Sequence, residues 1–182
     1  MSPAEFRERF LSGVRLAFAK APPGLLEQQS KFVRYDYGTM QRCGVGEQNA
    51  RFLSDIGLPR SASPFIDCRA HTDDEIAHLR EGGGGALRAL FPLGGANGCG
   101  DPFGIDTSTQ SVVYYNHDNG MQKVFMNASV PQFAEALCLF QDLLRTKADD
   151  KFATALEKVD KTALLPGSMW RLVSDHRRRK RQ

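Results

Sequence analysis

Hydrophobic residues recur at helical spacing from the start of the chain. The apolar positions, three or four residues apart, are Phe6, Phe10, Val14 and Ala17. Ser2 can cap such a helix, Pro3 suits its first position, and Glu5 closes a capping box. The pattern predicts a first helix that must end at the Pro-Pro-Gly sequence of residues 22–24.

The next part of the chain has a weaker pattern. Residues 25–45 have a mixed pattern of hydrophobic and polar positions, and only residues 32–37 favour a short strand. A second helix is predicted over residues 47–56. Gly57 stands where a left-handed C-terminal cap is wanted, and Pro59 follows as a stop.

A stiff segment and a glycine run follow this helix. We expect residues 61–69 to be extended, because two closely spaced prolines bracket the segment. Asp73, Asp74 and Glu75 then lead into four glycines at residues 82–85, which predicts a mobile surface loop. The glycines do not match a phosphate-binding loop, because no Lys-Ser/Thr pair follows them and the next segment favours a strand.

The centre of the chain has the pattern of a β-sheet. Strands are predicted over residues 86–93, 98–106, 110–115 and 122–126. Asn119-Gly120 lies between the last two runs, and this dipeptide is the strongest short-range signal for a hairpin. We therefore expect a central antiparallel meander of about four to six strands.

After the predicted sheet the hydrophobic period returns to that of a helix. Ser129 is a candidate N-cap, with Gln132 three positions later. The apolar face that should cover the sheet consists of Phe133, Leu137, Phe140 and Leu144. Two shorter helices are predicted over residues 150–159 and 168–175, the last anchored by Trp170. A meander flanked by N- and C-terminal helices is an α+β fold.

Composition agrees with a globular protein that stays in the cytoplasm. Of 182 residues, 41% are hydrophobic and 25% are charged, and no apolar run approaches the length of a membrane span. The first ten residues are charged and do not resemble a signal peptide. We expect reduced thiols at the four scattered cysteines, Cys43, Cys68, Cys99 and Cys138. The glycosylation pattern at residues 127–129 is then expected to be only a strand-to-helix corner.

No arrangement of residues points to catalysis or to a metal. No histidine lies in a nucleophile elbow, and the histidines do not have the spacing of metal ligands. His71, His78 and Glu75 could, however, share a helix face. His117 and Asp118 fall at a predicted hairpin tip and are expected to be solvated turn residues. We interpret the carboxylates at 101 and 106 as polar side chains of turns and strand edges, and not as an acid/base pair. We expect no catalytic residue, no metal and no cofactor.

Charge is distributed unevenly along the chain. Five basic residues lie within 177–182, and removing them from the 24 basic residues leaves 19 against 21 acidic ones. We expect this tail to be solvated and frayed, with at most a weak contact to nucleic acid. Residues 89–122 contain no lysine or arginine. The acidic side chains proposed to contact a basic partner protein are Asp73, Asp74, Glu75, Asp101 and Asp118.

Several short motifs resemble those of a known family. They are Ile56-Gly57-Leu58-Pro59, Pro64-Phe65, Gly100-Asp101-Pro102-Phe103-Gly104-Ile105-Asp106, Phe125-Met126-Asn127-Ala128-Ser129, Asp160-Lys161-Thr162-Ala163-Leu164 and Trp170. Together they cover residues 45–175 and resemble the SUKH superfamily, in particular its bacterial toxin-immunity branch, which is related to cell-wall-assembly regulators. Residues 1–45 carry no matching motif.

The resemblance implies a protein-binding domain. It implies an antidote that binds a polymorphic bacterial toxin, often a nuclease, and blocks it without chemistry of its own. Residues 1–176 would form the single domain and residues 177–182 the basic tail. The alternatives are a regulatory or scaffold module that uses the same surface for a cellular partner, and an enzyme whose site the sequence does not reveal.

Overall fold

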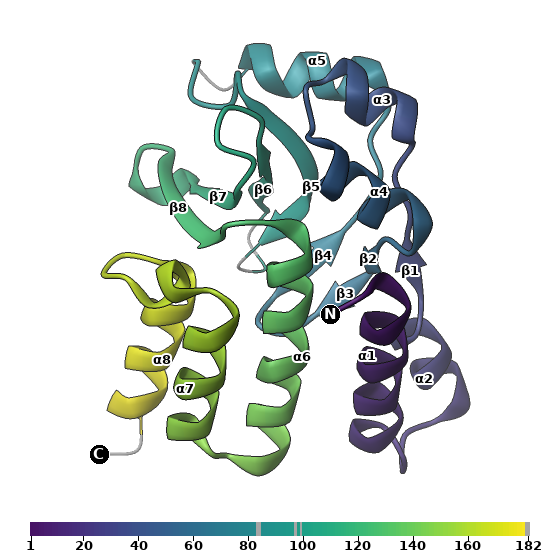
Figure 1. The fold of residues 1–182 in the computed structure, drawn as a ribbon, viewed down its shortest axis with the longest axis vertical. Coiled ribbons are helices and arrows are strands. Elements are labelled where there is room, and N and C mark those ends of the chain that lie inside the picture. Colours follow the sequence, from purple (N-terminus) through teal and green to yellow (C-terminus); the bar gives the residue numbers. More distant parts are fainter. Residues whose placement is uncertain (83–84, 97, 99, 181–182) are drawn as a thin grey trace.

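A meander of antiparallel strands runs through the middle of the molecule (Figure 1). The computed structural model describes residues 1–82, 85–96, 98 and 100–180. Each strand of the main sheet pairs with the next in sequence, in the order β3 (Ser61–Ala62), β4 (Ile66–Cys68), β5 (Leu90–Ala96), β6 (Asp101–Asp106), β7 (Val112–Asn116) and β8 (Gln122–Asn127). The six strands confirm the predicted meander and the α+β class.

Helices precede and follow this sheet. The N-terminal part contains α1 (Pro3–Ala17), α2 (Pro23–Gln29), α3 (Tyr37–Arg42), α4 (Glu47–Asp55) and a small sheet of β1 (Phe32–Val33) with β2 (Leu58–Pro59). Helix α5 (Asp73–Gly82) interrupts the meander. The C-terminal part contains α6 (Val130–Thr146), α7 (Asp149–Val159), the short helix η2 (Lys161–Leu164) and α8 (Met169–Arg179). In the described ranges, no helix combines the length and apolarity that a membrane span requires.

Helix α6 covers one face of the sheet, as its apolar spacing predicts. Phe133 lies against Phe103 of β6, with ring centroids 6.0 Å apart. Ser129 caps the helix by accepting a hydrogen bond from the backbone N–H of Gln132. Leu144, at the far end of the predicted apolar face, lies away from this contact and is 42% exposed. The main core therefore lies between the sheet and α6.

The other face of the sheet carries a smaller apolar layer. Leu87, Leu90, Val113 and Tyr115 form a separate buried cluster. Leu79 of α5 and Met121, which precedes β8, pack against this cluster. We call this side the outer face of the sheet.

The last helices are held to the corner between β8 and α6. Trp170 is fully buried, with its ring centroid 5.6 Å from that of Phe140 and 5.9 Å from that of Phe152. Its indole Nε1 donates a hydrogen bond of 2.8 Å to Asn127 Oδ1, and Asn127 donates to Asp160 Oδ2 at 3.0 Å. The anchor predicted for Trp170 is confirmed, and Asn127, with no exposed surface, is a structural corner residue.

Gly57 shows why the end of α4 was predictable. Its φ is +80°, a conformation that residues with a side chain rarely adopt. A Cβ atom there would lie 1.9 Å from the carbonyl oxygen of Val33, on β1. Glycine is therefore required both for the turn and for the close approach of β1.

Three sequence-based expectations were wrong. Asp73, Asp74 and Glu75 lie in the first turn of α5 and not in a loop, because Thr72 and Glu75 form reciprocal capping hydrogen bonds. The first two long strands begin later than predicted, at residues 90 and 101. The tail is not frayed from residue 177, because α8 continues to residue 179. The predictions for Cys99 and for the centre of the glycine run fall outside the described residues.

Candidate partner-binding surface

Three loops lie together at one end of the main sheet. In an antiparallel meander alternate connections share an end, so the β3–β4, β5–β6 and β7–β8 connections are neighbours. The contacts agree, because Asp101 at the start of β6 bonds to His117 in the β7–β8 connection. A Cβ atom on Gly98 would lie 3.8 Å from the ring of Phe65 in the β3–β4 connection. We call these three connections the hairpin end.

Asp101 supports the hairpin end from inside. It is only 2% exposed, and its Oδ1 accepts a hydrogen bond of 3.0 Å from the backbone N–H of His117. The same oxygen contacts Nδ1 of the His117 ring. The exposed position expected for Asp101 was therefore wrong, because the neighbouring loop closes over it and uses its carboxylate as a partner.

Asp118 has the opposite environment. Its side chain is 80% exposed, and its Oδ1 lies 3.1 Å from His117 Nε2. The His117 ring thus lies between a buried carboxylate and an exposed one, in the short helix η1 (His117–Asn119). Gly120 and Met121 follow with φ of 61° each, so the turn predicted at Asn119-Gly120 is present in a longer form. Asp118 is the acidic residue of this loop that a partner can reach.

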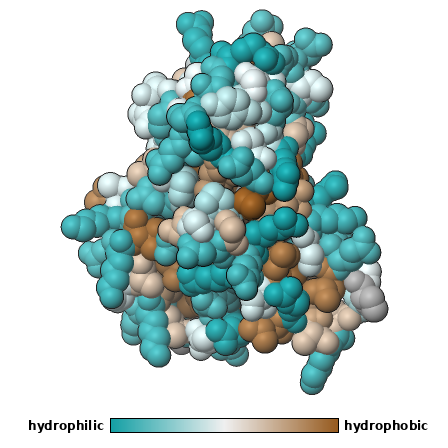
Figure 2. Space-filling model, turned by 45° about the vertical axis from the view of Figure 1, so that its right-hand side comes forward, coloured by the Kyte–Doolittle hydropathy of each residue, from teal (hydrophilic) through white to brown (hydrophobic). Residues whose placement is uncertain are grey.

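The acidic residues of α5 also divide into different roles. Asp73 contacts Arg42 at 2.7 Å and Thr39 at 3.0 Å, and these hydrogen bonds lower the pKa of its carboxyl group. Glu75 closes the capping box with Thr72. Asp74 is exposed on the same helical turn. Figure 2 shows predominantly hydrophilic side chains at the top of the molecule, the end where Figure 1 places α5.

The structure places α5 and the hairpin end beside the same face of the sheet. Leu79 of α5 and Met121 of the β7–β8 connection both pack against the apolar cluster of the outer face. The acidic first turn of α5 lies beyond that contact, next to Arg42 of α3. The sequence-predicted acidic residues therefore border one face from two sides and do not form a single cluster.

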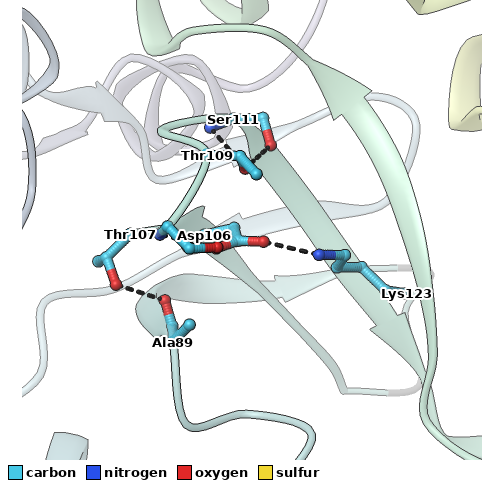
Figure 3. Close-up of polar contacts among 7 residues, drawn as sticks. Ala89, Asp106, Thr107, Thr109, Ser111 and Lys123 are labelled. Carbon is cyan, nitrogen blue, oxygen red and sulfur yellow. Dashed lines mark hydrogen bonds and ion pairs between the residues drawn. The ribbon is translucent and has the colours of Figure 1, made fainter.

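Asp106 of β6 and Lys123 of β8 form a charged pair across the intervening strand β7 (Figure 3). Lys123 Nζ lies 2.7 Å from Asp106 Oδ2, while the backbone N–H of Ser108 donates to Oδ1 at 2.9 Å. Burial alone would raise the pKa of Asp106, but hydrogen bonds from Lys123 and Ser108 outweigh it and lower that pKa. Asp101 and Asp106 thus have separate partners and do not form an acid/base pair.

The turn after Asp106 is fixed by further hydrogen bonds. Thr107 Oγ1 donates to the carbonyl oxygen of Ala89 at 2.9 Å, and Thr109 and Ser111 join their hydroxyl groups at 2.6 Å (Figure 3). Gln110, with φ of 62°, accepts from the backbone N–H of Gly46 before α4. This turn ties the sheet to the N-terminal helices at the end opposite the hairpin end.

The described residues provide no arrangement for metal chemistry. Within residues 1–82, 85–96, 98 and 100–180, no group of three His, Cys, Asp or Glu side chains is placed to hold a metal ion. Burial lowers the pKa of His71, which precedes α5 and does not share its face with His78. The thiols described, at Cys43, Cys68 and Cys138, are free, and burial raises the pKa of Cys138 to about 12.

An exposed aromatic residue was missed as a candidate for binding. Phe65, in the β3–β4 connection, is 73% exposed, although sequence reasoning had treated it only as part of a fold motif. Its place between two short strands and directly after a proline is the signal that could have identified it as a loop tip.

Comparison with known proteins identifies one relationship. A family model described as SUKH-4 immunity protein matches residues 25–176, which is most of the chain. The match begins before residue 45, so it includes most of α2, together with β1 and α3, in addition to the motif-bearing segments. No curated protein and no solved structure matches the chain.

Proposed function

The chain belongs to the SUKH-4 immunity protein family, within the SUKH superfamily, and we propose that it neutralises a cognate bacterial toxin by binding it stoichiometrically at the hairpin end. The family match over residues 25–176 is the observation that carries this proposal. An immunity protein of this kind occludes its toxin and needs no nucleophile, metal or cofactor. The toxin would be a basic protein, and a nuclease fits that description.

The hydrogen bonds that hold the β7–β8 connection of the hairpin end support a binding role. Asp101 fixes the β7–β8 connection through the backbone and ring of His117. The β5–β6 connection begins after Ala96, which pairs with Asp101 across the two strands. A connection that is held in place before binding loses little conformational entropy when a partner docks.

Charge supports a basic partner. Asp118 projects from the hairpin end, and residues 89–122 contain no lysine or arginine to offset it. Asp74 adds an exposed carboxylate beside the outer face. A nuclease must hold a polyanion and so carries basic side chains, which an acidic surface attracts and covers. Steering by opposite charge would speed association, most strongly at low salt.

We further propose that residues 1–176 act as one binding domain that includes the N-terminal helix. Phe6 and Phe10 of α1 are buried in the main core. Arg9 of α1 bonds to Asp142 of α6 at 3.0 Å. A toxin docked at the hairpin end would therefore meet a scaffold in which α1 supports the helix that covers the sheet.

The proposal is tested by binding the product of the gene directly upstream of the gene for this chain, where we expect the toxin to be encoded; we call this product the adjoining toxin. Asp118→Lys should preserve the melting temperature and weaken the complex at low salt by about 0.2 to 1 kcal/mol, as expected for a charge at the rim of an interface. Glu157→Lys, an equal change at an exposed position on α7, is the control. Equal affinities of wild type and Asp118→Lys at low salt would remove the hairpin end from the interface.

A further inference from the structure

Phe65 combines two features that folding alone does not explain. It is a large apolar side chain with 73% of its surface exposed. Its φ of 58° places it in the left-handed region, where a bulky residue is an outlier. A glycine would relieve the backbone, and a polar residue would suit the exposure. Residues held in such conformations concentrate at functional sites.

Phe65 forms one wall of an open groove. The groove has a volume of about 500 Å³ and lies between the β3–β4 connection, α6 and α8. Leu144 of α6 and Leu172 of α8 line it with 42% and 50% of their surfaces exposed. Phe140 and Met169, both buried, lie beneath. We call this feature the apolar groove.

One end of the apolar groove is basic. His176, Arg177 and Lys180, from the last turn of α8, line this end. Arg177 is fixed by Asp149 of α7, with Nε 2.9 Å from Oδ1. Lys180 is exposed, and the neighbouring residues at 178 and 179 are exposed arginines. Apolar walls with a cationic end complement a segment that carries both apolar and acidic side chains.

We propose that the apolar groove binds an amphipathic, acidic segment of the toxin. Its apolar side chains would pack against Phe65, Leu144 and Leu172, and its carboxylates would face Lys180. This proposal rests on the proposed function and adds a second contact to it. Phe65 belongs to both the groove and the hairpin end, so a single partner can cover the two surfaces without a gap.

The basic residues alone have a simpler explanation, but the groove does not. Cations at the C-terminal end of a helix are stabilised by the helix dipole, which accounts for a basic end of α8. The dipole does not explain why three large apolar side chains from three separate elements remain exposed around one hollow. Exposed apolar surfaces of this kind mark sites of protein–protein contact.

The test uses the adjoining toxin and three changes in the groove. Phe65→Gly should keep or raise the melting temperature, because glycine adopts a positive φ without strain, and should weaken toxin binding at least about tenfold, as for an interface anchor. Leu172→Glu should weaken binding similarly. Lys180→Glu should have a smaller effect that disappears at high salt. Leu16→Glu, at a 61% exposed leucine on α1, is the control and should bind like wild type.

The outcomes separate this proposal from the proposed function. Wild-type affinity in both Phe65→Gly and Leu172→Glu overturns the groove as a contact and leaves Asp118 as the contact at the hairpin end. Failure of wild type to bind the toxin overturns the proposed function and the groove together. Binding of a single-stranded oligonucleotide or an anionic vesicle that is lost in these two variants, while toxin binding is retained, also overturns the proposal.

Discussion

His117 donates its backbone N–H to the buried carboxylate of Asp101, at 3.0 Å, and so ties the β7–β8 connection to the start of β6. Asp118, the next residue, contacts the other nitrogen of the same ring and remains 80% exposed. These two acidic residues of the hairpin end therefore have different environments. Asp101 maintains the shape of the hairpin end, and Asp118 provides its charge.

Removing these two carboxylates should affect folding differently. Asp101→Ala removes the buried carboxylate that accepts from the partly buried N–H of His117 and should lower the free energy of unfolding by about 1–3 kcal/mol. Asp118→Ala should change it by no more than about 0.5 kcal/mol, as at other exposed positions. Urea denaturation of both variants measures the difference. Equal stabilities would contradict the supporting role of Asp101.

Substitution of the corner residue Asn127 should also lower the stability of the protein. Asn127→Ala removes the acceptor of Trp170 Nε1 and one donor to Asp160, so it should lower the free energy of unfolding by at least about 2 kcal/mol. Asn119→Ala, at an exposed asparagine, is the matched control and should remain near wild type. A loss at Asn127 no larger than that at Asn119 would mean that the C-terminal helices do not depend on this corner.

The stability of the folded protein should depend on pH because of Asp106. Its pKa is lower in the folded protein than in the unfolded chain, so the unfolded chain takes up this proton first as the pH falls. The stabilisation by Lys123 is complete above about pH 4 and decreases as the pH falls through the folded pKa. The stability difference between wild type and Asp106→Asn should therefore shrink between pH 6 and pH 3. A difference that stays constant over this range would contradict the assignment.

Substitution of Gly120 should destabilise the protein because of its backbone conformation alone. Its φ of 61° favours glycine, while nothing lies within 4 Å of the position that a Cβ atom would take. Gly120→Val should lower the free energy of unfolding by more than about 1 kcal/mol, and Gly120→Asn should cost clearly less, since asparagine tolerates this conformation. Thermal melting of the two variants distinguishes them, and equal melting temperatures would be inconsistent with the observed turn.

The elements that the sequence predicted well are those defined by local signals. The cap at Ser129, the left-handed Gly57 and the turn at Asn119-Gly120 each depend on residues a few positions apart. Helix α5 has such a signal as well, in the capping box of Thr72 and Glu75, but the glycine run after it is typical of a loop and obscures that signal. Patterns that span only a few residues identify a helix or a turn, but they do not show which distant parts of the chain it contacts.

The candidate binding surface depends on contacts that no local pattern contains. Asp101 is buried because a loop sixteen residues later covers it, so its sequence position alone suggested an exposed strand end. The exposure of Phe65 depends on where α8 lies, more than 100 residues further along the chain. Apolar residues are expected in a core unless packing shows otherwise, and this expectation concealed the groove.

The most direct test of the account is a titration of the adjoining toxin's activity with increasing amounts of the purified chain. Stoichiometric binding predicts that inhibition rises linearly and is complete at one equivalent. The groove proposal adds that Phe65→Gly needs a large excess to reach the same inhibition. Inactivation of many toxin molecules by one molecule of this chain would reveal catalysis, and no inhibition at several equivalents of folded protein would exclude the toxin as partner. Either result would contradict the central claim.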